Sequence, residues 1–122
     1  SDVVKGERFA GKTIYSITDA GKAYFETLMD QISEQGVSLA FDFNVVVTNL
    51  NKMDREHALS LIKKLRDGIT ASAEKNEEYA RQYADIPLVG RTIFDQQRML
   101  CQALLEWLDT FEAQFTQDQP LP

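Results

Sequence analysis

The first pattern that could do chemistry is a match to the phosphate-binding loop, G-x-x-x-x-G-K-[ST], which runs from Gly6 to Thr13. In a working loop of this kind, the glycine-rich backbone follows a buried strand and opens a helix, whose first amides bind the phosphates. Here only Val3 and Val4 precede the pattern, and the residues after it, TIYSIT, are typical of a strand. We therefore do not expect nucleotide binding; calorimetric titration with ATP would test this.

The chain has one cysteine, Cys101, and one histidine, His57, which could act as a pair if they met in space. His57 falls in the first turn of a predicted helix, and Cys101 follows an apolar helix position, where cysteine is usually inert packing. A metal site needs clustered His, Cys or carboxylate ligands, but the acidic run Glu74, Glu77 and Glu78 is typical of a solvated helix face. We predict no catalytic residue, no metal site and no cofactor.

Aromatic side chains carry a further signal at Phe43, Tyr79, Tyr83, Trp107 and Phe111. The ordinary interpretation is a hydrophobic core. The alternative is a helix-lined apolar pocket or a dimer seam, because aromatic residues anchor both. A short chain with two long amphipathic helices has few faces against which to bury both apolar stripes. Pairing with a second copy would bury them, which favours the seam.

Composition narrows the class of protein. The 122 residues, 26% charged and 43% hydrophobic, have the size and balance of one domain. A single cysteine excludes an intramolecular disulfide and fits a reducing compartment, so we predict a cytoplasmic location. No stretch approaches the ~20 apolar residues of a membrane helix, so we expect no membrane partner. The 19 acids exceed the 13 bases, which argues against the whole chain being a nucleic-acid-binding surface.

The charge is unevenly distributed. Residues 1–24 hold four bases and three acids, a balance of +1, so the remainder holds 9 bases and 16 acids, a balance of −7. Such an asymmetry can mark parts of a chain with different partners.

The elements that position these residues begin with a hairpin. Residues 12–18 alternate and are rich in β-branched and aromatic types, which predicts a strand. Val3 and Val4 offer a short partner strand across a basic, glycine-containing loop. Thr18 should then cap a helix that stops at Gly36, and Gly21 in its first turn indicates a close backbone approach.

Residues 39–53 have a composition typical of a strand, but their apolar residues have helical spacing. Their apolar positions fall at i, i+3, i+4 and i+7 and are Phe43, Val46, Val47 and Leu50. This spacing predicts a short, heavily buried helix.

Two long helices follow. Asp54 should cap the first, which runs to about Tyr83 and carries a heptad seam that turns polar in its second half. The apolar half of that seam is Ala58, Ile62, Leu65 and Ile69. The Ile86-Pro87 pair forces a break, because a residue before proline avoids the helical region. The last helix, from about Thr92 to Phe115, has a seam at Ile93, Gln97, Leu100, Leu104, Trp107, Phe111 and Phe115.

The segment from Tyr15 to Phe25, YSITDAGKAYF, resembles the end of the wing in winged helix-turn-helix regulators. There the second wing strand finishes with Y-x-[IL]-T, and a T-x-x-G turn starts the next helix. The chain is most similar to the PadR family of transcriptional regulators, in which an F-x-F-type short helix, a long helix and a final amphipathic helix with a Trp beside an acid follow. Here these are Phe41-Asp-Phe43 and Glu106-Trp107. The resemblance covers essentially the whole chain.

The resemblance implies a mainly α fold, with a short wing hairpin followed by about four helices. We expect the wing and its following helix at 1–36, a helical dimerisation and effector region at 37–117, and a flexible tail at 118–122. Some three helices, including the recognition helix, precede the wing in that family. We therefore expect the chain to be a C-terminal portion, with most DNA binding located upstream.

The resemblance also implies sites and partners. Basic residues of the wing that would meet DNA phosphates are Lys5, Arg8 and Lys12. The predicted homodimer interface is Phe43, Val46, Val47, Leu50, Leu100, Leu104, Trp107 and Phe111. A small apolar or phenolic effector near this interface would shift the two winged-helix units and change operator affinity.

Three alternatives stay open. The wing signature is shared with MarR-like and other winged-helix regulators, which thread their C-terminal helices differently. A helical adaptor would bind a protein partner and never DNA. An enzyme has no supporting constellation of residues. A capped helix-turn-helix pattern upstream of Ser1 would decide between regulator and adaptor.

Overall fold

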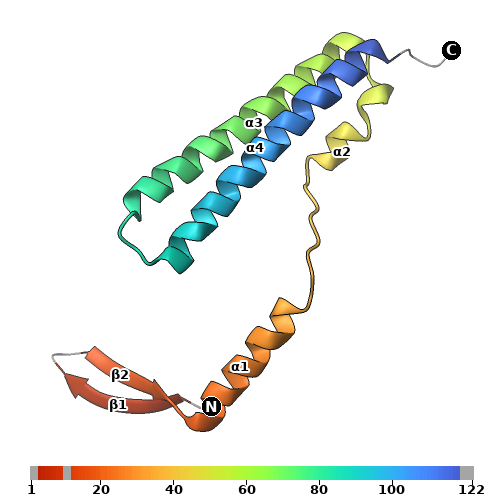
Figure 1. Ribbon diagram of the computed structural model, residues 1–122. Coiled ribbons are helices and arrows are strands. Elements are labelled where there is room, and N and C mark those ends of the chain that lie inside the picture. The colour runs from red at the N-terminus through yellow and green to blue at the C-terminus, as the bar shows by residue number, and fades with distance from the viewer. Residues whose placement is uncertain (1–2, 10–11, 119–122) are drawn as a thin grey trace. The chain divides into compact units, whose positions relative to one another are not determined.

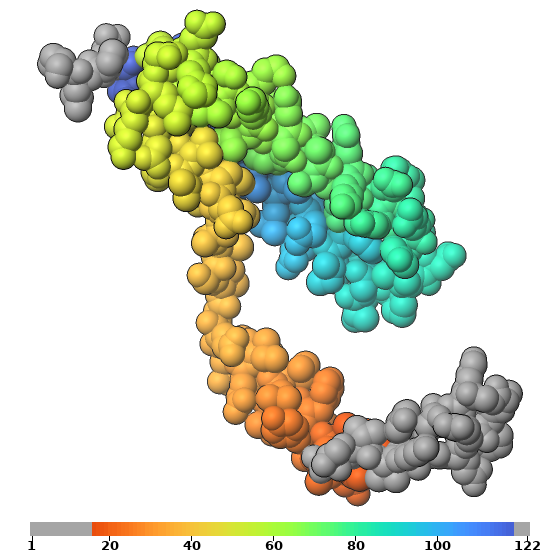
Figure 2. Space-filling view, turned by 180° about the vertical axis from the view of Figure 1, so that it is seen from behind, coloured from red at the N-terminus to blue at the C-terminus, as the bar shows by residue number. Residues whose placement is uncertain are grey.

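The computed structural model describes the backbone of residues 3–9 and 12–118 and the side chains of residues 16–118 (Figure 1). In order, its elements are β1 (Val3–Phe9), β2 (Lys12–Ile17), α1 (Asp19–Ser33), α2 (Asn44–Val47), the 3-10 helix η1 (Leu50–Lys52), α3 (Arg55–Gln82) and α4 (Leu88–Gln117). The fold is mainly helical, as the sequence predicts. The chain divides into two compact units, Ser1–Ala40 and Phe41–Pro122 (Figure 2), four residues after the expected division at 36/37.

The first unit contains the hairpin and α1. Strands β1 and β2 pair antiparallel, with Val3 opposite Ile17 and Phe9 opposite Lys12. The Thr18 hydroxyl accepts a hydrogen bond from the amide of Gly21 at 3.0 Å, which satisfies one of the unpaired donors of the first turn of α1. The predicted cap of this helix is therefore confirmed.

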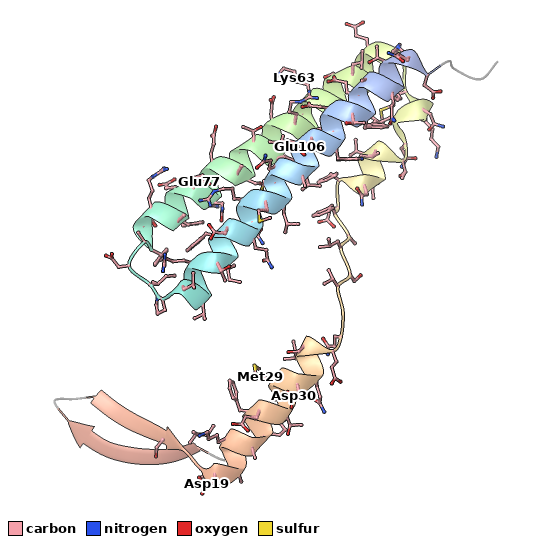
Figure 3. The ribbon with its side chains drawn as sticks, viewed as in Figure 1. Asp19, Met29, Asp30, Lys63, Glu77 and Glu106 are labelled. Carbon is pink, nitrogen blue, oxygen red and sulfur yellow. The ribbon has the colours of Figure 1, made fainter. Side chains whose placement is uncertain are left out.

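Helix α1 keeps its apolar face exposed. Gly21 is its buried residue, whereas Tyr24, Phe25, Met29 and Ile32 are exposed (Figure 3 labels Met29). A 15-residue helix is marginal in water unless an apolar face packs on something. This face therefore needs a partner surface to become stable. The contact of Gly21 with the hairpin that the sequence suggests stays a prediction.

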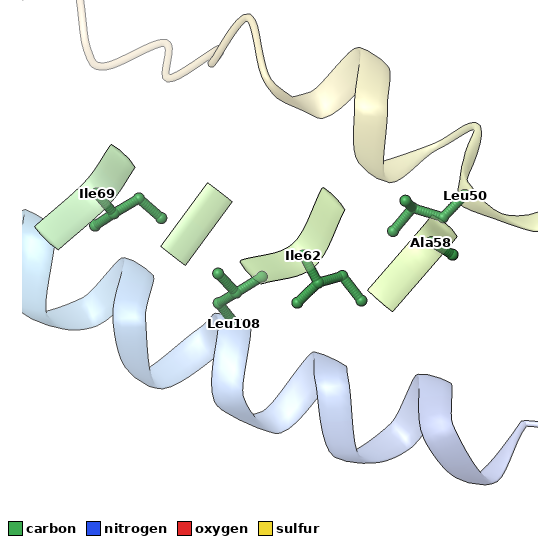
Figure 4. Packing of buried hydrophobic residues seen from close by; sticks show 5 residues of the cluster. All are labelled: Leu50, Ala58, Ile62, Ile69 and Leu108. Atoms are coloured by element: carbon green, nitrogen blue, oxygen red, sulfur yellow. The ribbon is translucent and has the colours of Figure 1, made fainter. Parts of the chain in front are cut away.

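The second unit is built on an antiparallel pair of long helices, α3 and α4, which lie side by side in Figure 1. Its buried centre contains Leu50 of η1, three residues of α3 and Leu108 of α4 (Figure 4). The α3 residues are Ala58, Ile62 and Ile69, all in the predicted seam. Asp54 caps α3 by accepting a hydrogen bond from the amide of His57 at 2.9 Å, as predicted.

The buried face of α4 is centred one residue beyond the predicted seam, although Leu104, Phe111 and Phe115 of that seam also pack partly against the core. Leu108 is fully buried against α3, whereas Trp107 is 37% exposed. One residue is a rotation of about 100° on a helix. The seam that faces α3 therefore contains Cys101, Leu105 and Leu108, one position after the predicted Leu100, Leu104 and Trp107. The helix also starts earlier than predicted, at Leu88, directly after Pro87 in its extended cap position.

The segment 39–53 is helical as predicted, but the expectation of one heavily buried helix is wrong. Helix α2 has only four residues and none is buried. Its end coincides with two polar side chains that bond back to its carbonyls: Thr48 Oγ1 to Asn44 at 3.0 Å and Asn49 Nδ2 to Val45 at 2.6 Å. Such bonds compete with helix propagation. Leu50, in the separate turn η1, is the residue that reaches the core.

Polar side chains hold α3 and α4 together where the seam is not apolar. Asn76 Nδ2 donates to the backbone carbonyl of Phe94 at 2.9 Å, which explains how the polar half of the α3 seam is tolerated. Arg98 bonds Glu77, which is labelled in Figure 3, with Nη2 3.0 Å from Oε2. Arg66 Nη2 lies 2.7 Å from Glu112 Oε1. Among the described residues, no helix is both long and apolar enough to cross a membrane.

Candidate functional site

The structure places the predicted wing residues on the two strands. Because Arg8 pairs with Thr13 and Phe9 with Lys12, the backbone brings Arg8 and Lys12 to the same end of the hairpin. Lys5 lies nearer the start of β1, opposite Tyr15, and a shift in strand register separates it from Arg8. Lys12 and Thr13 belong to a strand rather than to the first turn of a helix. The phosphate-binding-loop pattern therefore lacks the backbone geometry that its chemistry needs.

His57 and Cys101 do not meet. His57 is exposed in the first turn of α3, while Cys101 contributes to a pocket together with Ile69. Twelve residues separate His57 from Ile69, which is about 18 Å along a helix. A Cys–His dyad is therefore not formed. Of the acidic run, Glu77 is paired with Arg98. No group of three or more potential metal ligands is found among the residues that the structure describes.

An apolar pocket of about 390 Å³ lies in the second unit, between α3, α4 and the segment that precedes α2. Phe41 and Phe43 form one wall. The α3 side is formed by Lys64, Leu65, Gly68, Ile69 and Ser72, and the α4 side by Gln97, Leu100, Cys101 and Leu104. This volume falls in the range of small-molecule sites, roughly 300–1,000 Å³. We call this cavity the Gly68 pocket.

A row of aromatic rings borders the pocket. Phe41 and Phe43 stack with their centroids 5.3 Å apart and their planes 3° apart. Phe43 in turn stacks on Trp107 at 6.1 Å, and Trp107 on Phe111 at 6.0 Å. The stacking of Phe43 on Trp107 thus links the segment before α2 to α4. A ligand in the pocket would touch the first ring pair of this row.

A stripe of apolar residues on α4 continues from the pocket. At about 100° per residue, its members share one side of the helix; they are Val89, Ile93, Leu100, Leu104, Trp107 and Phe111. We call this set the α4 stripe. Leu104 and Phe111 pack partly against the core, but Val89 is 81% exposed, Ile93 51% and Trp107 37%. Val89 and Ile93 at the start of the stripe, and Trp107 near its other end, are therefore exposed, whereas Leu100 and Leu104 between them are half-buried.

The structure sorts the predicted interface residues into three groups. Leu50 is 1% exposed and lies inside the core of its own chain, so its assignment to an interface is wrong. Those that pack partly against that core are Phe43, Val46, Leu104 and Phe111. Val47 is half-buried, Leu100 lines the Gly68 pocket, and Trp107 is partly exposed.

The sequence interpretation did not identify several residues that the geometry brings forward. Val89 extends the α4 stripe by one turn, and its spacing of four from Ile93 was a usable signal. Gly68 was visible as a glycine inside a predicted helix. The role of Phe41 as a pocket wall depends on how the segment before α2 packs on two distant helices, which no local pattern encodes.

No protein-family model, curated protein or solved structure is significantly similar to the chain. The structural features that bear on function are the hairpin that leads into a capped helix, the Gly68 pocket and the α4 stripe.

Proposed function

We propose that the chain belongs to a PadR-like transcriptional regulator, in which it supplies the wing hairpin and the helical region that joins two copies. The sequence resemblance at Tyr15 to Phe25 supports the wing. The observed order of elements is compatible with it, because β2 leads directly into a helix capped by Thr18. A cytoplasmic location accompanies this function.

The observation that carries the proposal is the exposure of Val89, Ile93 and Trp107 in the α4 stripe. Monomers rarely expose a large continuous apolar patch, and such patches commonly mark protein interfaces. Trp107 lies in the stripe as a partly exposed aromatic anchor, the kind of residue that dominates binding energy in interfaces. The ion-paired residues Arg98 and Asp109 lie on the opposite side of α4, at about 100° per residue. One face of the helix pair is therefore left for a second copy.

Two-fold pairing through this stripe would be self-complementary, since the same residues are used by both copies. The separation of the two hairpins would then be set by the helices α3 and α4. Lys5, Arg8 and Lys12 would meet phosphates of operator DNA, which positions a protein without specifying sequence. A small molecule that changes the helical region would change this separation, and with it the affinity for the operator.

Sedimentation equilibrium tests the proposal. We expect the chain to have twice its 13.9 kDa mass, and the double variant Leu104→Glu plus Trp107→Glu to be monomeric or unfolded. The matched control is Gln102→Glu plus Ala113→Glu, which adds the same charge at two exposed positions on the opposite side of α4. A dimer of unchanged mass in the stripe variant would refute the proposal. Circular dichroism of each variant separates dissociation from unfolding.

A further inference from the structure

Gly68 occupies the middle of α3, where glycine destabilises a helix relative to alanine. A glycine there is commonly explained by a neighbour that leaves no room for a side chain. That explanation fails here, because a Cβ atom built on Gly68 would meet nothing within 4 Å. The space beside Gly68 is part of the Gly68 pocket. The packing of the chain on itself therefore does not require glycine at this position, whereas an object seated in the pocket would.

The walls of the Gly68 pocket suit a flat ring system. Gly68 offers bare helix backbone, so a ring can lie close to it. Phe41 and Phe43 line another side; Phe43 already stacks on both Phe41 and Trp107, so Phe41 is the ring left for a ligand, and offset stacking on such a ring is favourable. The volume of about 390 Å³ equals that of about a dozen water molecules at the roughly 30 Å³ each occupies in the liquid. A ligand of two fused rings fits this space.

The polar groups of the pocket fix the charge of the ligand. Lys64 is the one charged residue in the lining, and Ser72 and Gln97 add a hydroxyl and an amide. Among the described residues, no carboxylate lies within ion-pair distance of Lys64, whereas its neighbour Lys63 is paired with Asp67 at 2.9 Å. The ammonium group of an exposed lysine that lines an apolar pocket can attract an anionic group attached to an apolar body.

We propose that the Gly68 pocket binds a planar bicyclic aromatic carboxylate, with its rings between Gly68 and the Phe41–Phe43 pair and its carboxylate at Lys64. This deepens the proposed function, on which it rests for its regulatory meaning, by giving the effector a chemical class and a site within one chain. The pocket wall at Phe41 begins the second unit, and Phe43 stacks on Trp107 of the α4 stripe. A ligand that packs on these rings would thus act directly on the proposed dimer face.

Calorimetric titration of the purified chain with 2-naphthoate tests the proposal, with neutral 2-naphthylmethanol as the matched ligand. We expect saturable binding of 2-naphthoate and about tenfold weaker binding of the alcohol, the size of one charge-assisted contact. Lys64→Gln should weaken 2-naphthoate by about the same factor and leave the alcohol unchanged. Lys63→Gln, at the neighbouring exposed lysine outside the pocket, should change neither.

Filling the pocket gives a second, independent test. Gly68→Leu should abolish binding of both ligands, whereas Thr70→Leu, at an exposed position away from the pocket, should not. The chain has a single tryptophan, so the one indole N–H signal in a nitrogen-edited NMR spectrum belongs to Trp107 and should shift when 2-naphthoate binds. Circular dichroism checks that Gly68→Leu is folded. If Gly68→Leu is unfolded, Lys64→Gln still tests the proposal, because Lys64 is exposed and its substitution should not disturb the fold.

Three results would overturn the proposal. The first is no heat and no indole shift with 2-naphthoate. The second is binding that Gly68→Leu or Lys64→Gln leaves unchanged. The third is a loss of dimer mass in Gly68→Leu without loss of ligand binding, which would show that a second copy occupies the pocket. Because binding is measured without DNA and the mass is measured without ligand, failure of this proposal is distinguishable from failure of the proposed dimer.

Discussion

Leu108→Ala is the substitution that tests the packing of α4 most sharply. Leu108 is fully buried, and Ala58, Ile62 and Ile69 of α3 belong to the same buried cluster. Truncation to alanine removes apolar groups equivalent to three methylenes, each worth about 0.8 kcal/mol. The cavity left behind adds to this, and measured Leu→Ala losses in cores run from about 2 to 5 kcal/mol. We expect the free energy of unfolding to fall by about 3 kcal/mol.

The matched control is Leu88→Ala, the same change in the same helix at an exposed position. Its effect should stay within about 0.5 kcal/mol, as for most surface substitutions. Urea unfolding followed by circular dichroism, at one fixed protein concentration, measures both, since dimerisation makes apparent stability concentration-dependent. Equal losses in Leu88→Ala and Leu108→Ala would refute the assignment of Leu108 to the seam. So would a small loss in Leu108→Ala alone.

Three further predictions follow from individual contacts. Gly68→Ala should raise the free energy of unfolding by about 0.5–1 kcal/mol, whereas Gly90→Ala should gain less because its Cβ would lie 2.8 Å from Cδ1 of Ile86; urea unfolding compares the two. The hydrogen bond from Arg98 lowers the pKa of Glu77 below its ordinary value of 4.5, so this pair stabilises the fold above that pH and the contribution is lost as the pH falls through the lowered pKa. In Glu77→Gln, acid titration should show a smaller loss of stability over that range, and an unchanged profile would contradict this. Replacing the wing bases by alanine should weaken DNA binding equally for all duplex sequences and reduce its salt dependence, as fluorescence anisotropy would show; these bases are Lys5, Arg8 and Lys12.

The features that the sequence predicted correctly depend on local chemistry. Thr18 and Asp54 cap helices because a short polar side chain can reach an amide three residues ahead, whatever the rest of the fold does. The α3 seam was predictable for a similar reason. Ala58, Ile62 and Ile69 lie on one side of α3 at spacings of four and seven residues, and this spacing marks the buried face, although the neighbouring Leu59 and Leu61 are also apolar and pack partly against the core.

The seam of α4 could not be predicted in the same way. Leu104 and Leu105, and again Trp107 and Leu108, are adjacent apolar pairs, so two overlapping stripes fit the same segment. Periodicity does not choose between them, because the choice depends on which stripe meets α3. The pocket could not be predicted from the sequence for the same reason, because it depends on tertiary contacts. Phe41 is a loop residue whose position depends on the contacts of Phe43 and Leu50 with distant helices.

Sedimentation equilibrium of the wild-type chain beside Ile93→Arg tests the central claim, that the α4 stripe joins two copies, most directly. Ile93 is half exposed and lies outside the core cluster, so the variant should fold whether or not a dimer exists. We predict a wild-type mass of twice 13.9 kDa and a monomer for Ile93→Arg at the same concentration. A monomeric wild type, or an Ile93→Arg dimer as tight as the wild type, would contradict the account.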